Sequence, residues 1–199
     1  MKWIFAIGAV TFTSIALLQS GLSGRANSMG IGVPVEGRVV VQQASLQVDK
    51  AVWELDARIE IELPPAIRAG LDSGVPLEFV LTLELSEQRA FRPDPTLLDL
   101  RRRYELVYYD LTRHYRVRSF DDGTGRNYRS LPTALRGLGD LDGVPLGTVD
   151  KHILGRGKAM RARLELSLDE RALPLPLRSP GGSSWKLPSE RFEWTVPAT

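Results

Sequence analysis

The sequence predicts an all-β domain, an antiparallel β-sandwich of about seven or eight strands with two short helices. Strict alternation of apolar and charged side chains, with turn-forming residues between the alternating segments, supports this prediction. In residues 52–63, VWELDARIEIEL, each odd-numbered side chain from Trp53 to Leu63 is apolar and each side chain between them is charged. That period of two is typical of a strand with one wet face. The alternative is an α+β fold in which helices cover one face of a single curved sheet.

Further strands are expected in order along the chain. Residues 76–88 and 161–169 alternate as cleanly as the first segment, and so does the short run 191–196. Residues 38–48 form a weaker strand upstream. We find no internal repeat or change of composition, so residues 37–199 are expected to form a single β-rich domain.

Two short helices are indicated by their terminal residues. Residues 64–74 begin with two prolines, which suit a first turn, and end near a glycine. Residues 130–139 offer a serine cap, an early proline and a terminal glycine. Neither segment is long enough to form a layer, so we expect both helices to cover the open ends of sheets.

A tyrosine-rich hairpin is expected within YELVYYDLTRHYRVRSF, residues 104–120, which holds four of the five tyrosines of the chain. One strand is predicted at 104–111 and another at 113–119, with a turn over 110–113. Two interpretations stay open. The rings can fill a core while the cations form a solvated face paired with acids, or rings and cations can form a platform for an anion or a glycan. The candidate interaction surface comprises Tyr108, Arg113, His114, Tyr115, Arg116, Arg118 and Trp185.

The first 26 residues have the features of a secretory signal peptide. Lys2 precedes a strongly apolar run over 3–18, and small residues follow at 24–26. We expect cleavage after Ala26, a short polar lead over 27–36, and a periplasmic location. The alternative is an uncleaved inner-membrane anchor with the domain facing the periplasm, and only then would the membrane be contacted.

Charge and composition exclude several classes of protein. The chain has 26 basic and 24 acidic residues, and removal of Lys2 and Arg25 leaves 24 of each. A neutral mature domain argues against nucleic-acid binding. The absence of cysteine excludes disulfides, thiolate metal sites and cysteine nucleophiles.

No catalytic, metal or cofactor motif is complete. His114 and His152 are 38 residues apart, and neither belongs to a His-x-x-x-His or other local ligand pair. The run that starts at Asp140 begins like a calcium loop, but it has Pro145 and Lys151 where an EF-hand requires glycine and glutamate. We therefore expect no cofactor, no metal and no enzymatic activity; an envelope hydrolase is an unsupported alternative.

A resemblance to a known family covers residues 36–196. The hairpin motif (Tyr104, Leu106, Tyr108, Leu111, Thr112, Tyr115, Val117), the SLPTAL segment at 130–135, LPLPLR at 173–178 and the segment from Trp185 to Trp194 resemble DUF 4390, a proteobacterial family of exported domains of unknown function. The family has no assigned activity, so it supplies no catalytic residues. The resemblance implies an envelope protein, and a sensor kinase as a possible partner through gene neighbourhood alone.

Three functions are therefore compared. The first is a non-enzymatic interaction or accessory protein, with a membrane sensor as its partner. The second is a module that binds a glycan, a lipid headgroup or a small anion through the hairpin and Trp185 or Trp194. A concave site with exposed rings would favour a ligand, whereas a flat sheet face or an exposed edge strand would favour a protein partner. The third function is the hydrolase named above.

Overall fold

The computed structural model describes residues 37–89, 93–148, 159–174, 177 and 185–197. By internal contacts the chain divides into two units, residues 1–33 and 34–199, and all described residues belong to the second. The predicted signal peptide (1–26) and polar lead (27–36) lie outside the described residues. No helix within the described residues is long and apolar enough to cross a membrane.

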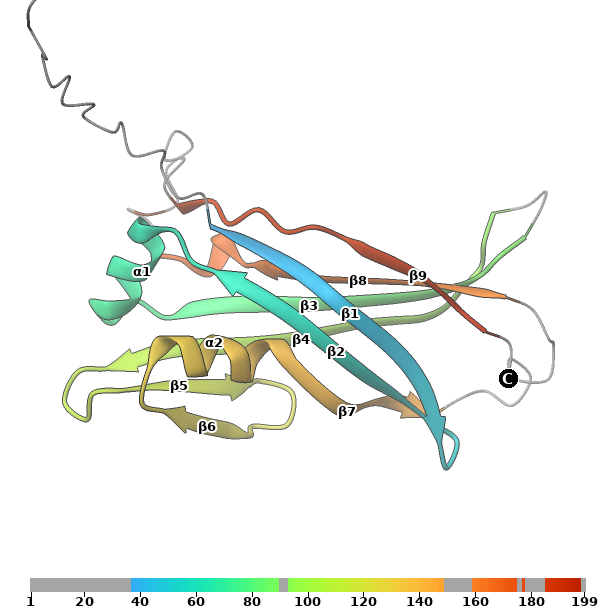
Figure 1. Cartoon of the computed structure of the whole chain (residues 1–199), viewed down its shortest axis with the longest axis horizontal. Helices are drawn as coiled ribbons and strands as arrows, with labels where there is room; N and C mark the ends of the chain where they lie inside the picture. The colour runs from blue at the N-terminus through green and yellow to red at the C-terminus, as the bar shows by residue number, and fades with distance from the viewer. Residues whose placement is uncertain (1–36, 90–92, 149–158, 175–176, 178–184, 198–199) are drawn as a thin grey trace, which may run out of the picture. The chain divides into compact units, whose positions relative to one another are not determined.

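The domain is a two-sheet antiparallel β-structure that is not closed into a barrel, which confirms the predicted class (Figure 1). The smaller sheet has the order β1–β2–β7, with bounds β1 (Arg38–Asp49), β2 (Val52–Glu62) and β7 (Asp140–Thr148). The larger has the order β6–β5–β4–β3–β8–β9, with bounds β3 (Leu77–Glu87), β4 (Thr96–Tyr109), β5 (His114–Ser119), β6 (Gly125–Tyr128), β8 (Met160–Leu168) and β9 (Phe192–Val196). Because two sheets face one core, the single-sheet alternative does not apply.

The core lies between the sheets and consists of the apolar positions of the alternating strands. In β2, Trp53, Leu55 and Ile59 are buried while the charged residues between them are not. In β3, Phe79 and Leu81 are completely buried. Each strand therefore places one apolar face on the core, as the period of two predicts.

One side of the sandwich is joined and the other is open. On the joined side, the backbone of Val39 in β1 exchanges hydrogen bonds with Pro188 (2.9 Å) and Glu190 (3.2 Å), just before β9. On the other side, β7 ends the small sheet and β6 ends the large one, and these two edges do not pair. The open side is the place where a concave site can form.

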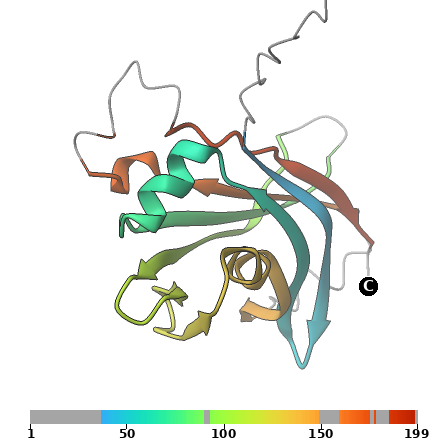
Figure 2. The ribbon, with the colours of Figure 1, turned by 60° about the vertical axis from the view of Figure 1, so that its left-hand side comes forward.

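Two helices close the ends of the core. Helix α1 (Pro65–Asp72) buries Ile67 and Leu71, an apolar pair four residues apart. Helix α2 (Leu131–Gly139) buries Leu131, Ala134 and Leu138. Figure 2 shows α2 almost end-on, between the small sheet and the β5–β6 hairpin. A 3-10 turn, η1 (Glu170–Ala172), follows β8.

The structure differs from the sequence prediction at three strands, β4, β6 and β7, of which the short β6 (Gly125–Tyr128) was not predicted. Strand β4 begins at Thr96, eight residues before the predicted start at Tyr104. Strand β7 was not predicted, because Gly143, Pro145 and Gly147 interrupt its alternation. Proline removes a backbone donor and is tolerated in an edge strand, and β7 is the edge of the small sheet.

Candidate functional site

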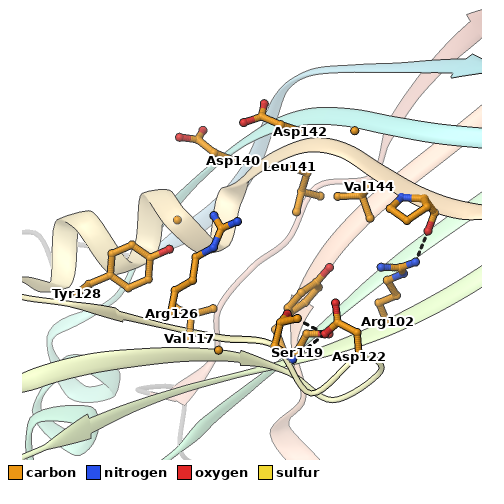
Figure 3. A pocket seen from close by; sticks show the side chains of 16 residues that line it. Arg102, Val117, Ser119, Asp122, Arg126, Tyr128, Asp140, Leu141, Asp142 and Val144 are labelled. Atoms are coloured by element: carbon orange, nitrogen blue, oxygen red, sulfur yellow. Dashed lines mark hydrogen bonds between the residues drawn. The ribbon is translucent and has the colours of Figure 1, made fainter. Parts of the chain in front are cut away.

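The open side of the sandwich contains a polar cleft of about 250 Å³, here called the seam cleft (Figure 3). Its walls come from β4, β5 and β6 of the large sheet, from the end of α2 and from β7 of the small sheet. The residues that line it are Arg102, Tyr104, Val117, Ser119, Asp122, Thr124, Gly125, Arg126, Tyr128, Gly137, Asp140, Leu141, Asp142, Gly143, Val144 and Pro145.

Strand register explains why polar side chains face this cleft. Ser119 of β5 lies opposite Tyr104 of β4, and Val117 lies opposite Arg126 of β6. Arg102 lies opposite the buried Leu81. Because side chains directly opposite each other share a face of the sheet, these polar residues all occupy the inner, core-facing side. They take positions where the alternation would place an apolar residue.

Arg102 connects the two sheets across the opening. Its guanidinium donates a hydrogen bond to the carbonyl of Pro145 in β7 (Figure 3). The neighbouring Tyr104 is half-buried, and burial raises the pKa of its phenol, an effect that the positive charge of Arg102 partly offsets. Tyr104 therefore stays protonated at neutral pH and can donate a hydrogen bond into the cleft.

For two hydrogen-bond donors of the cleft, the structure shows no well-formed hydrogen bond to a described residue. The side chain of Ser119 is buried, with 7% of its surface exposed. Its hydroxyl contributes to the lowered pKa of the Asp122 carboxyl, yet its oxygen reaches hydrogen-bonding geometry with no described group. Within the part of the chain that the structure describes, the guanidinium of Arg126 also makes no hydrogen bond or ion pair. Ser119 is buried, and buried polar groups without a partner are uncommon in folded proteins, whereas Arg126 is exposed to solvent.

Two of the acidic groups around the cleft, Asp122 and Asp140, are already engaged. Asp122 accepts hydrogen bonds from the backbone N–H of Thr124 (2.9 Å) and from its hydroxyl (2.8 Å), and the first of these contributes most to lowering the pKa of Asp122. Asp140 lies 3.5 Å from Arg58. In Figure 3, Asp140 and Asp142 point away from Leu141, which projects into the cleft. The unsatisfied groups inside the cleft are thus donors.

A glycine of α2 permits the close approach of an aromatic wall. A side chain at Gly137 would overlap the ring of Tyr128, with the Cε1 atom 2.7 Å from the added Cβ. The Tyr128 ring therefore rests on the helix backbone and closes one end of the cleft.

The tyrosines of the predicted interaction surface lie on the inner side of the hairpin. Tyr108 and Tyr115 pack against the core, with ring centroids 4.8 Å apart. The Tyr115 hydroxyl donates a 2.8 Å hydrogen bond to Asp72 of α1. These contacts match the interpretation in which the rings fill a core.

The cations of that surface lie elsewhere. Arg118 faces the other side of the sheet and pairs with Glu105 at 3.0 Å, as a solvated face would. Arg116 shares that side, with its guanidinium beside Gly125. The ring Nδ1–H of His114 donates to the carbonyl of Thr112 (3.1 Å), because a carbonyl can only accept.

The remaining two residues of the predicted surface lie apart from both groups. Arg113 is exposed in the turn and has a positive φ of 50°. Trp185 packs against the core beside Gly70 of α1. The structure therefore does not unite the seven predicted residues in one surface.

The sequence analysis missed Arg102, Ser119 and Arg126. A signal was nevertheless present in β4, where Leu98, Leu100, Tyr104 and Leu106 share one face and Arg102 interrupts them. A charged residue at an inward position of an alternating strand marks a place where the core gives way to a polar site. Arg102 could be recognised as such a residue only if β4 was known to begin at Thr96.

The described residues contain no group of three or more histidine, aspartate or glutamate side chains that could hold a metal ion. Comparison with known proteins gives a family: the model of a domain of unknown function, DUF4390, matches residues 36–195. No curated protein and no solved structure matches the chain.

Proposed function

We propose that this chain, which belongs to the DUF4390 family, is an exported, non-enzymatic binding protein that holds an anionic group in its seam cleft. The anionic group is a carboxylate or a phosphate on a small molecule. The observation that carries the proposal is that two donors line the same cleft: the buried Ser119 hydroxyl, for which the structure shows no well-formed hydrogen bond, and the exposed Arg126 guanidinium, which pairs with no described residue. Export rests on the signal-like residues 1–26.

The chemistry of the cleft favours an anion over a cation or a neutral ligand. Arginine binds carboxylates and phosphates through charge-assisted hydrogen bonds, which are roughly twice as strong as neutral ones. A hydroxyl donor at the cleft floor would supply a further bond. The carboxylate of Asp122 is occupied by Thr124, so it offers little to a cation.

The size and lining of the cleft limit the ligand. A volume of about 250 Å³ is below the range of roughly 300–1,000 Å³ that is typical of sites for drug-sized molecules. The ligand is therefore a small acid, or one charged headgroup of a larger molecule. The rings of Tyr104 and Tyr128 provide apolar contact beside the charge.

An accessory protein that acts on a membrane partner, such as a sensor kinase, is the second candidate. Strand β6 supports it, because its outer edge pairs with no other described strand. An extended peptide can add to such an edge through backbone hydrogen bonds. Because β6 also forms a wall of the seam cleft, the two candidates differ in the groups they use: a peptide would pair with the backbone of β6, whereas an anion would bind the side chains of Ser119 and Arg126.

Thermal unfolding of the full chain with added ligands tests the first candidate. Glycerol 3-phosphate and succinate serve as anionic probes, and glucose serves as the neutral one. We expect the anions to raise the melting temperature in a saturable manner, because a ligand that binds only the folded state stabilises it. Arg126→Gln should abolish this rise.

Arg129→Gln is the matched control. Arg129 is exposed, follows β6 directly and does not line the cleft, so its substitution removes the same charge and should leave the rise intact. Equal stabilisation by glucose would replace the anion proposal with a neutral glycan. Equal loss in both variants would show that the effect is general charge screening.

A further inference from the structure

We propose that the tip of the β4–β5 hairpin inserts into the surface of a lipid bilayer. The hairpin tip comprises residues 110–113, between the paired Tyr109 and His114. Leu111, within it, is 99% exposed, and Tyr109 at its base is 42% exposed. Among the described residues these are the large apolar side chains left exposed. They are separated from the seam cleft by the length of β5, so the proposal is independent of the anion site.

The turn itself is well defined. The backbone N–H of Arg113 donates to the carbonyl of Asp110 (3.3 Å), and the Nδ1–H of His114 donates to Thr112 (3.1 Å). The Tyr109 ring lies 6.0 Å from the ring of His114. These contacts define a turn that holds Leu111 outward.

Two residues of this turn are of types that are unusual at their positions. Arg113 has a φ of 50°, a conformation that favours glycine or asparagine over a residue with a Cβ. Leu111 occupies a fully exposed position that a polar side chain would fill without cost. Leu111 is 99% exposed, and the Arg113 side chain makes no hydrogen bond or ion pair with a described residue; such departures are expected at functional positions.

The distribution of side chains fits a bilayer. An apolar side chain stands at the extremity, an aromatic ring at its base, and an arginine at its flank; aromatic rings favour the membrane interface, and arginines extend their charge toward it. The same end of the domain carries Arg68 and Arg129, both exposed. Basic side chains near a membrane are attracted to anionic lipids.

The position of the tip relative to the chain supports the same partner. Residue Gly37, where the described domain begins, contacts Pro64 at the start of α1, and Asp72 at the end of that helix contacts Tyr115 in the hairpin. The tip and the start of the domain thus lie at one end, with α1 between them (Figure 1). The apolar run at 3–18 precedes that end in sequence.

A protein pocket fits these features less well. A stable interface buries roughly 800 Å² on each partner, and a four-residue turn with two charged members offers far less apolar surface. A bilayer needs no matched pocket. A single side chain gives weak binding, so the tip would serve as a second contact beside another anchor.

The absence of cysteine from the chain allows a direct test. The full chain carrying Leu111→Cys is labelled with an environment-sensitive dye and reconstituted with vesicles of phosphatidylethanolamine and phosphatidylglycerol. We expect the dye emission to shift to shorter wavelength and to be quenched by nitroxide-labelled lipids. Because position 111 is fully exposed, the substitution leaves the fold intact, which thermal unfolding verifies.

Ala51→Cys in the β1–β2 turn provides the matched control. This turn is exposed, also has a positive φ (65°) and lies at the far end of the small sheet (Figure 1). A dye attached at position 51 should keep the emission wavelength that it has in water. Aqueous emission from both positions would overturn the proposal. A shift at position 111 that depends on protein concentration without vesicles would replace the lipid with a second copy of the chain.

Discussion

The Tyr115 hydroxyl lies 2.8 Å from the Asp72 carboxylate, and this hydrogen bond joins strand β5 to the last residue of helix α1. Tyr115 belongs to the hairpin that the sequence offered as a binding platform. Its ring packs on the core and its hydroxyl is occupied. The bond therefore assigns Tyr115 to holding α1 and the hairpin together.

Tyr115→Phe tests this role. The change keeps the ring and removes the hydrogen bond, so we expect a loss of about 0.5–1.5 kcal/mol in the free energy of unfolding. Urea denaturation measures it. Tyr109→Phe is the control, because the exposed Tyr109 makes no hydrogen bond to a described residue and its substitution should change stability little. Equal stability of both variants would mean that the bond to Asp72 contributes nothing.

Stability should also fall at alkaline pH. Burial, followed by the hydrogen bond to Asp72 and its negative charge, raises the pKa of Tyr115 from 10.0 to about 12. A raised pKa favours the protonated phenol in the folded state, so the stabilisation is complete below pH 10 and is lost as the pH rises toward 12. The pKa of Tyr104 is raised as well, so Tyr115→Phe should make the decline shallower without abolishing it. Thermal unfolding between pH 9 and about 12 measures this decline. An equally steep decline in Tyr115→Phe and in the unchanged protein would contradict the assignment of the effect to Tyr115.

Trp185 should act as a packing residue over α1. A Cβ at Gly70 would overlap the Trp185 ring, so Gly70→Ala should cost about 1–3 kcal/mol through overpacking. In a Trp185→Ala background the overlap is gone, and the better helix propensity of alanine should make the same change neutral or stabilising. A double-mutant cycle by urea denaturation measures this reversal of sign. If Gly70→Ala lowers stability equally in both backgrounds, the Trp185 ring does not pack against Gly70.

Much of the fold could be predicted from alternation alone. In β2 and β8 every second residue is apolar and every one of these is buried, because a strand between a core and water imposes a period of two. Strand β7 could not be predicted, since Gly143 and Pro145 obscure the pattern and a distant partner, β2, pairs with it.

The candidate site was harder to predict from the sequence than the fold. Arg102 and Ser119 are nearly 20 residues apart, and only the pairing of β4 with β5 brings them to one cleft. The cleft exists because β7 and β6 fail to pair, and the absence of a pairing has no local sequence signal. The tyrosines of the hairpin suggested a binding surface. The polar site is formed instead by the inward-facing Arg102 and Ser119.

Ser119→Ala should separate stability from binding. Removing a buried hydroxyl without a partner removes its desolvation cost, so the ligand-free protein should be equally stable or more stable by about 1 kcal/mol. Binding of glycerol 3-phosphate should weaken, because the donor is lost. Ser130→Ala is the contrast, since the Ser130 hydroxyl bonds with Thr133 (2.9 Å) outside the cleft and its loss should lower stability alone. Calorimetric titration and urea denaturation of both variants measure the two effects.

The most direct test of the seam cleft as an anion site is the NMR signal of the arginine side-chain Nε–H groups during titration with inorganic phosphate. The Arg126 signal should shift in a saturable manner, while that of Arg129 shifts little, because Arg126 lines the cleft and Arg129 does not. Small, linear shifts shared equally by all arginines would show only general ionic effects. That result would contradict the proposal that the cleft binds an anion.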